Sequence, residues 1–162
     1  MGIRKIVTEG DPVLGKTSRP VTAFDAKLHI LIDDMRETLR DANGLGLAAV
    51  QVGILRRVVL VINEEDEILE LVNPEIVSQS GTQEGLEGCL SVPGIYGEVT
   101  RPMQVKVRAQ DRFGETFEVE DTGITARCFC HELEHLDGHL FKEKAERLYT
   151  AEELDAMEKE NH

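Results

Sequence analysis

The stretch "CHELEHLDGHLF" (Cys130–Phe141) places two histidines four residues apart, with a glutamate directly after the first. On a helix the side chains of His131 and His135 lie within about 40° of each other, so both rings point to one side. Phe129 and Leu133 lie on the opposite side, where they form the apolar stripe of a buried helix. One face of this helix is therefore predicted to build the core and the other a metal site, which makes the helix the centre of the fold.

Two further helices are predicted around this centre. Between Asp25 and Gly44 the apolar residues recur at helical spacing, and Gly44 is expected to end the helix in a left-handed conformation. Thr150 and Glu153 have the spacing of a capping box, which predicts a terminal helix over "TAEELDAMEKE" (Thr150–Glu160). The apolar stripe of the first helix consists of Leu28, Leu31, Ile32, Met35 and Leu39.

Segments rich in β-branched residues, several of them with alternating polarity, lie between the first helix and the central helix. The turn signals "NPE", "VPG" and "RFGE" separate them. Since strands run together with a helix before them and another after, the predicted fold class is α+β, with antiparallel or mixed β-sheets packed around the central metal-binding helix. The predicted strands are Arg56–Ile62, Glu67–Val77, Glu98–Asp111 and Glu115–Asp121.

The length of 162 residues suits one well-buried core, so a single domain over residues 1–162 is expected. The net charge of −13 argues against nucleic-acid binding as the main task, because phosphates would be repelled. No apolar run approaches the roughly 18 residues of a membrane helix. The start, "MGIRKIVTEGDP" (Met1–Pro12), resembles neither a secretory nor a myristoylation signal. The sequence therefore predicts a cytoplasmic protein without a membrane partner.

Two histidines need a third protein ligand, and the downstream sequence offers no convincing one. A third histidine would be expected six residues after His135, but that position is Phe141. The glutamates of the terminal helix lie on a highly charged segment that is expected to face solvent. They are Glu152, Glu153 and Glu158.

Upstream, Cys89 lies in the apolar stretch "EGCLSVPG" (Glu87–Gly94), where it is either a small buried residue or a ligand. The odd number of cysteines, three, favours free thiols or metal ligands over a disulfide framework. A thiolate with two imidazoles leaves one coordination position open for water, as a catalytic site requires. Glu132 projects about 100° from His131, where it can reach such a water but cannot ligate beside the rings.

The stretch "GLGLAAVQVG" (Gly44–Gly53) superficially suggests a dinucleotide-binding loop. It follows a helix rather than a strand, however, and lacks the third glycine at the required spacing. The segment therefore connects a helix to a strand. Gln51 is unusual within it, because a carboxamide among small apolar residues needs a hydrogen-bond partner.

Three stretches together, "GLGLAAVQ", "EGCLS" and "HELEHLDG", occur in the order and spacing of the signature motifs of the peptide deformylases, which this chain resembles over nearly its whole length. The resemblance implies that Cys89, His131 and His135 bind a divalent metal ion and that a water completes the coordination. Glu132 would take the proton of this water as general base and later deliver a proton to the leaving amine. Further catalytic roles fall on the side-chain amide of Gln51 and the backbone N–H of Leu90, which would hold the developing oxyanion.

The resemblance also implies how the substrate, an N-formylmethionyl nascent peptide, is bound. Main-chain groups of Leu45 and Gly46 would pair with the substrate backbone. The methionine side chain would enter an apolar pocket, at whose rim Arg127 is expected to direct its charge towards solvent. Glu87 and Arg101 are expected to pair and to brace the cysteine loop. The pocket positions are Gly88, Ile124 and Cys128.

Two histidines and a cysteine by themselves suggest zinc, whereas the resemblance implies Fe²⁺, with Ni²⁺ or Co²⁺ as active substitutes.

The protein is expected to be a monomer. Some bacterial family members are thought to dock on the ribosome through a basic terminal helix, but Thr150–His162 carries five acidic residues and one lysine. Docking of this chain by that route is therefore not expected, since an acidic helix is repelled by ribosomal RNA.

Two other functions are compatible with parts of the sequence. A zinc endopeptidase would use His131, His135 and a downstream glutamate, and it would keep its metal in the Cys89→Ser variant. A non-catalytic protein would hold a structural metal only. The presence of Glu132 and Gln51 argues against this last possibility, because a structural site needs neither.

Overall fold

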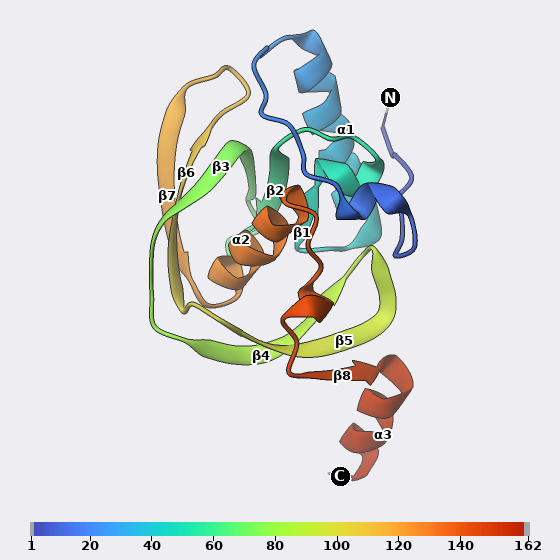
Figure 1. Cartoon of the computed structure of the whole chain (residues 1–162). Coiled ribbons are helices and arrows are strands. Elements are labelled where there is room, and N and C mark those ends of the chain that lie inside the picture. Colours follow the sequence, from blue (N-terminus) through green and yellow to red (C-terminus); the bar gives the residue numbers. More distant parts are fainter. Residues whose placement is uncertain (1, 161–162) are drawn as a thin grey trace.

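The structure is a computed structural model that describes residues 2–160, without the side chain of Glu160 (Figure 1). Its α-helices are α1 (Ala26–Ala42), α2 (Gly123–Leu136) and α3 (Ala151–Glu160). Short 3-10 helices cover Pro12–Gly15, Ala49–Val52 and Phe141–Glu143. The strands are β1 (Gly46–Ala48), β2 (Val58–Ile62), β3 (Ile68–Ser80), β4 (Gln83–Cys89), β5 (Val92–Arg101), β6 (Gln104–Gln110), β7 (Thr116–Thr122) and β8 (Arg147–Thr150).

The strands form two sheets, and within the described part of the chain all pairings between named strands are antiparallel. The larger sheet has the order β1-β2-β3-β6-β7, and the smaller sheet has the order β4-β5-β8. In Figure 1, α2 crosses the interior between β4 and β5 on one side and the larger sheet on the other. The predicted α+β fold with sheets packed around a central helix is therefore confirmed.

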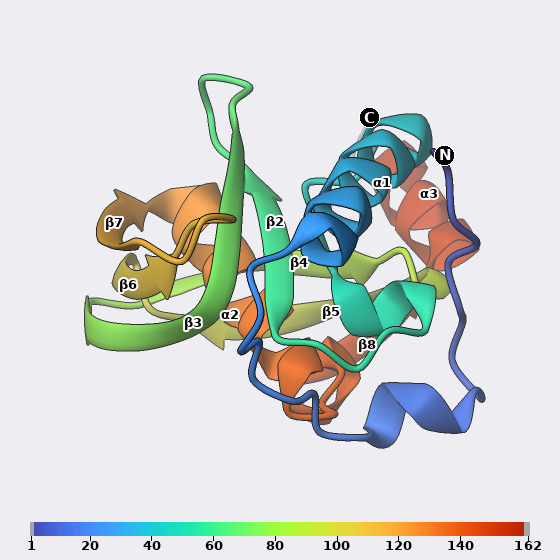
Figure 2. The same cartoon turned by 90° about the horizontal axis from the view of Figure 1, so that it is seen from above.

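Strand β2 explains why helices cover both faces of the larger sheet. Its five residues are all buried, and successive side chains point to opposite faces. Val58 and Leu60 pack with the predicted apolar stripe of α1, whereas Val59 and Val61 pack with α2. Figure 2 shows α1 and α2 on opposite sides of β2. The central helix α2 is thus held on the face of the larger sheet that also faces β4 and β5.

Several boundaries differ from the predicted ones. The residue in the left-handed conformation at the end of α1 is Asn43, with φ 55°, and not Gly44, because asparagine also tolerates this region. The predicted strand Glu98–Asp111 is split into β5 and β6 at Pro102, which has no N–H for a ladder. At this break the chain leaves the smaller sheet and joins the larger one.

Two predicted turns lie inside strands instead. "NPE" lies within β3 at a shift of register, where Asn73 has φ 50° and its side chain bonds the backbone of Val21. "VPG" is the start of β5, and the actual turn is formed by Leu90 and Ser91. The short strands β1, β4 and β8 were not predicted, because edge strands of three to seven residues leave a weak pattern.

The capping box at the start of α3 is present as predicted. The Glu153 N–H donates to Thr150 Oγ1 at 3.0 Å, and the Thr150 N–H donates to Glu153 Oε1 at 3.3 Å. Among residues 2–160 there is no helix with the length and apolarity to cross a bilayer.

Candidate metal centre and active site

Three predicted ligands come together although they lie on different elements. Cys89 ends β4, and His131 and His135 lie one turn apart on α2. Their ligand atoms are all within 4.8 Å of one another, and Cys89 Sγ is 3.3 Å from His135 Nε2. A thiolate and two imidazoles at this spacing fit a divalent transition metal and leave a coordination position open.

The downstream glutamates are not part of this group. Glu152, Glu153 and Glu158 lie on α3, which packs against β8 and β5, and among the described residues the cluster of possible ligands holds only Cys89, His131 and His135. The endopeptidase interpretation therefore has no third ligand from α3.

Burial of His135 lowers its pKa to about 3, so its ring is neutral, which is the form that ligates metals.

The second ring nitrogen of His131 is held by a buried carboxylate. His131 Nδ1 lies 2.9 Å from Glu87 Oε1, which leaves Nε2 for a metal. Burial alone would raise the pKa of Glu87, but hydrogen bonds from Arg101 and His131 lower it to about 2. Glu87 is therefore ionised and fixes the orientation and tautomer of the His131 ring.

Two arginines support this carboxylate. Arg101 donates to both oxygens of Glu87, at 2.8 and 2.9 Å, as predicted for the brace of the cysteine loop. Arg127 donates to Glu87 Oε2 at 2.7 Å and to the Val99 carbonyl at 3.0 Å. The prediction that Arg127 directs its charge towards solvent is wrong: the residue is 8% exposed, because the buried anion attracts the guanidinium inward.

Glu132 is buried beside the metal group and is 4% exposed. Burial raises its pKa to about 7, so the carboxyl can gain and lose a proton near neutral pH. No described residue bonds its Oε1 atom. A Cβ on Gly46 would lie 2.5 Å from Glu132 Oε2, which explains the need for glycine at this position of β1.

Gln51 has the partners that its surroundings require. It is 1% exposed, and its Oε1 accepts a hydrogen bond from the Ala48 N–H at 2.9 Å. Its Nε2 donates to Ser91 Oγ at 3.1 Å and points to Cys89 Sγ at 3.6 Å. One amide N–H therefore faces the metal group, as an oxyanion donor must.

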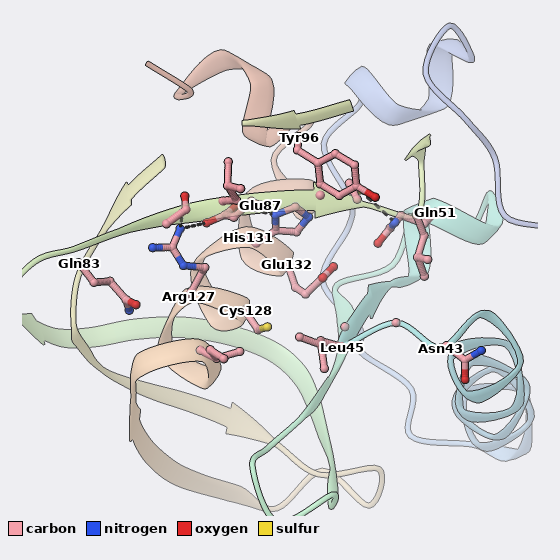
Figure 3. A pocket seen from close by; sticks show the side chains of 18 of the residues that line it. Asn43, Leu45, Gln51, Gln83, Glu87, Tyr96, Arg127, Cys128, His131 and Glu132 are labelled. Carbon is pink, nitrogen blue, oxygen red and sulfur yellow. Dashed lines mark hydrogen bonds and ion pairs between the residues drawn. The ribbon is translucent and has the colours of Figure 1, made fainter. Parts of the chain in front are cut away.

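A cavity of about 560 Å³ is lined by the predicted site residues with the exception of His135 (Figure 3). β1 and β4 are edge strands of their sheets and border the cavity from two sides. Figure 3 shows Glu87, His131 and Glu132 near the middle of the view, with Gln51 on the right and Gln83 on the left. The predicted lining residues are Leu45, Gly46, Gln51, Gly88, Cys89, Leu90, Ile124, Cys128, His131 and Glu132.

Several lining residues are not among the site residues that the sequence indicated, namely Asn43, Gly44, Gln83, Glu84, Gly85, Leu86 and Tyr96. Leu86 is 49% exposed on β4 and lines the cavity, and the Tyr96 ring covers Gly88, whose added Cβ would lie 2.8 Å from it. The alternation in "EGLEGC" was the available signal for an edge strand bordering a groove.

Burial raises the pKa of the Cys128 thiol to about 12, so this residue contributes an uncharged surface to the cavity.

Comparison with known proteins gives a consistent result. The family described as polypeptide deformylase matches residues 3–151. The chain is 51% identical to a peptide deformylase of Caldicellulosiruptor bescii over 155 residues, which is 96% of this chain and 93% of that protein. It is 48% identical to peptide deformylase 1 of Bacillus subtilis, over 98% of this chain and 99% of that protein. The crystal structure of the Thermotoga maritima peptide deformylase superposes with a TM-score of 0.87 at 39% identity, covering 91% of this chain and 100% of that one.

Proposed function

The chain belongs to the polypeptide deformylase family and is a metal-dependent hydrolase that removes the N-terminal formyl group from nascent peptides, and we propose that it does so in the cavity between β1 and β4. The observation that carries this placement is that the ligand atoms of Cys89, His131 and His135 lie within 4.8 Å of one another, and that Cys89 and His131 line the cavity. Glu132 and Gln51 line the same space. The reaction would release formate and a free amino terminus.

Cys89, His131 and His135 would hold the metal. Their chemistry supports an ion that accepts one thiolate and two imidazoles, and we propose Fe²⁺ on the family resemblance, with Ni²⁺, Co²⁺ or Zn²⁺ as ions that the same ligands would accept. When bound, the ion supplies a Lewis acid that polarises the formyl carbonyl and acidifies a water molecule. Glu87 keeps His131 in the tautomer that ligation requires.

The protein side chains would then move the protons and stabilise the charge. Glu132 accepts the proton of the attacking water and returns a proton to the leaving nitrogen, for which a pKa near neutrality is suitable. The Gln51 amide and the Leu90 N–H would donate to the oxyanion that develops on the formyl oxygen when the water oxygen adds to the formyl carbon. Leu90 follows Cys89 directly, so its N–H originates beside the metal group.

The edge strands would bind the peptide backbone. The Leu45 carbonyl already accepts a hydrogen bond from the Ile62 N–H at 2.8 Å, and Gly46 pairs with Val61. In such an antiparallel pair the main-chain groups of Gly46 point to the free edge of β1, which supports Gly46 as the main-chain partner of the substrate. The side chain of Leu45, which is 52% exposed, would cover the bound peptide.

The methionine side chain would lie against the uncharged part of the cavity. Ile124 and Cys128 project from α2 into the cavity, and Gly88 borders it from β4. The neutral thiol of Cys128 supports an apolar contact there.

We also propose that the protein is a cytoplasmic monomer and that residues 1–162 act as one catalytic domain. It would make no direct contact with nucleic acid and would not dock on the ribosome through the acidic α3.

One assay tests this function against the alternatives. Protein prepared without oxygen is offered formyl-Met-Ala-Ser, the same peptide without the formyl group, and an internally extended peptide. Formate release from the first peptide alone is expected. The Cys89→Ser variant is expected to lose both metal and activity. Internal cleavage, or full metal retention in Cys89→Ser, would contradict the proposed site.

A further inference from the structure

Ser91 is a buried hydroxyl beside the catalytic cavity that has no assigned task. It is 0% exposed and does not line the cavity, so it cannot touch the substrate. Its Oγ accepts a hydrogen bond from Gln51 Nε2 at 3.1 Å. It follows Leu90 in the turn between β4 and β5. Ser91 therefore contacts one proposed oxyanion donor and neighbours the other in sequence.

The bonds of the Gln51 carboxamide leave one N–H for catalysis. The Ala48 N–H can only donate, so Gln51 Oε1 must face it, which sets the orientation of the amide. The two hydrogens on Nε2 then have different environments. One is taken by Ser91 Oγ, and the other is directed towards Cys89 Sγ, 3.6 Å away. That second hydrogen is the one available to an oxyanion beside the metal group.

The main chains of Gln51 and Ser91 are tied independently of this side-chain bond. The N–H of Val7 donates to the Gln51 carbonyl at 2.8 Å, and the N–H of Glu9 donates to the Ser91 carbonyl at 2.7 Å. The N-terminal segment thus links the 3-10 helix Ala49–Val52 to the turn between β4 and β5. Removing Ser91 Oγ should therefore release the carboxamide of Gln51 without moving the backbone on either side.

We propose that Ser91 is a positioning residue that aims Gln51 at the oxyanion, an inference that rests on the proposed role of Gln51. Without Ser91 Oγ a buried N–H of Gln51 lacks a partner, and the carboxamide turns to find another. The remaining N–H then leaves the direction of the metal group. Because this interaction matters only when negative charge develops on the substrate, the loss falls on kcat and not on KM.

The test is a double-mutant cycle with Ser91→Ala, Gln51→Ala and the double variant, each checked for equal metal content. Gln51→Ala is expected to lower kcat about 100-fold, as the loss of one oxyanion donor does. Ser91→Ala is expected to lower kcat about 10-fold with an unchanged KM for formyl-Met-Ala-Ser, since a displaced donor loses part of that effect. The double variant should match Gln51→Ala, because Ser91 acts only through that residue.

A control separates positioning from loss of stability. Val72→Ala removes buried volume on the α1 face of the larger sheet, away from the cavity, and should lower the melting temperature without lowering kcat. Full kcat in Ser91→Ala, or a further loss of about 10-fold on adding it to Gln51→Ala, would refute the inference alone. Full kcat in Gln51→Ala would refute the oxyanion role of Gln51 itself, and the inference with it.

Discussion

The buried carboxyl of Glu132 should make the metal-free protein less stable at alkaline pH than its Glu132→Gln variant. The group is 4% exposed, and burial raises its pKa from 4.5 to about 7. Well below pH 4.5 the carboxyl is protonated in the folded and unfolded states alike. Between pH 4.5 and pH 7 only the unfolded state ionises, so the free energy of unfolding falls as pH rises. Above about pH 7 the loss is complete and constant.

The size of the effect follows from the two pKa values. Their difference, at about 1.36 kcal/mol for each pKa unit, amounts to about 3 kcal/mol. The amide that the Glu132→Gln substitution introduces has nearly the shape of the carboxyl and does not titrate. For a chain of this length, about 3 kcal/mol corresponds to a difference in melting temperature of roughly 6–12 °C.

Urea unfolding of both metal-free proteins at about pH 4 and about pH 8 measures this directly. All other groups are the same in the two proteins, so their titration largely cancels in the difference between them. The variant should equal the wild type at the acidic pH, exceed it by about 3 kcal/mol at the alkaline pH and show no deformylase activity when reloaded with metal. A difference that is the same at both pH values would refute the reasoning.

Three other changes test the surroundings of the metal group. Glu87→Gln should weaken metal binding about 10- to 100-fold in a chelator competition, because His131 Nδ1 loses its anionic partner; unchanged binding would mean that this contact does not tune the ligand. Gly46→Ala should lower kcat at least about 10-fold at an unchanged circular dichroism spectrum, since its Cβ would displace the Glu132 carboxylate, and normal turnover would contradict that contact. Cys128→Leu should raise KM for formyl-Met peptides about 10-fold while sparing formyl-Ala peptides, and an equal effect on both would place the methionine pocket elsewhere.

The elements that could be predicted from the sequence are those whose pattern depends on residues close together in the chain. The stripe from Leu28 to Leu39 and the capping box at Thr150 depend on residues three or four apart, and both are present. The smaller sheet was largely missed, because β4 and β8 are short edge strands whose pattern is weak without the strand that they pair with. Pro102 was visible in the sequence, but its role at the switch between sheets depends on where β6 is docked.

The sequence by itself determined the helix that carries His131 and His135, because helical periodicity alone puts both rings on one face. Its motifs also indicated Glu132 on the same helix and Cys89 and Gln51 as the residues that join it from elsewhere in the chain. Only the tertiary structure decided the inward turn of Arg127, the raised pKa of Glu132 and the contact between Gln51 and Ser91. These properties depend on burial and on contacts between residues 40 positions apart, which come together only when α2 is enclosed between the two sheets.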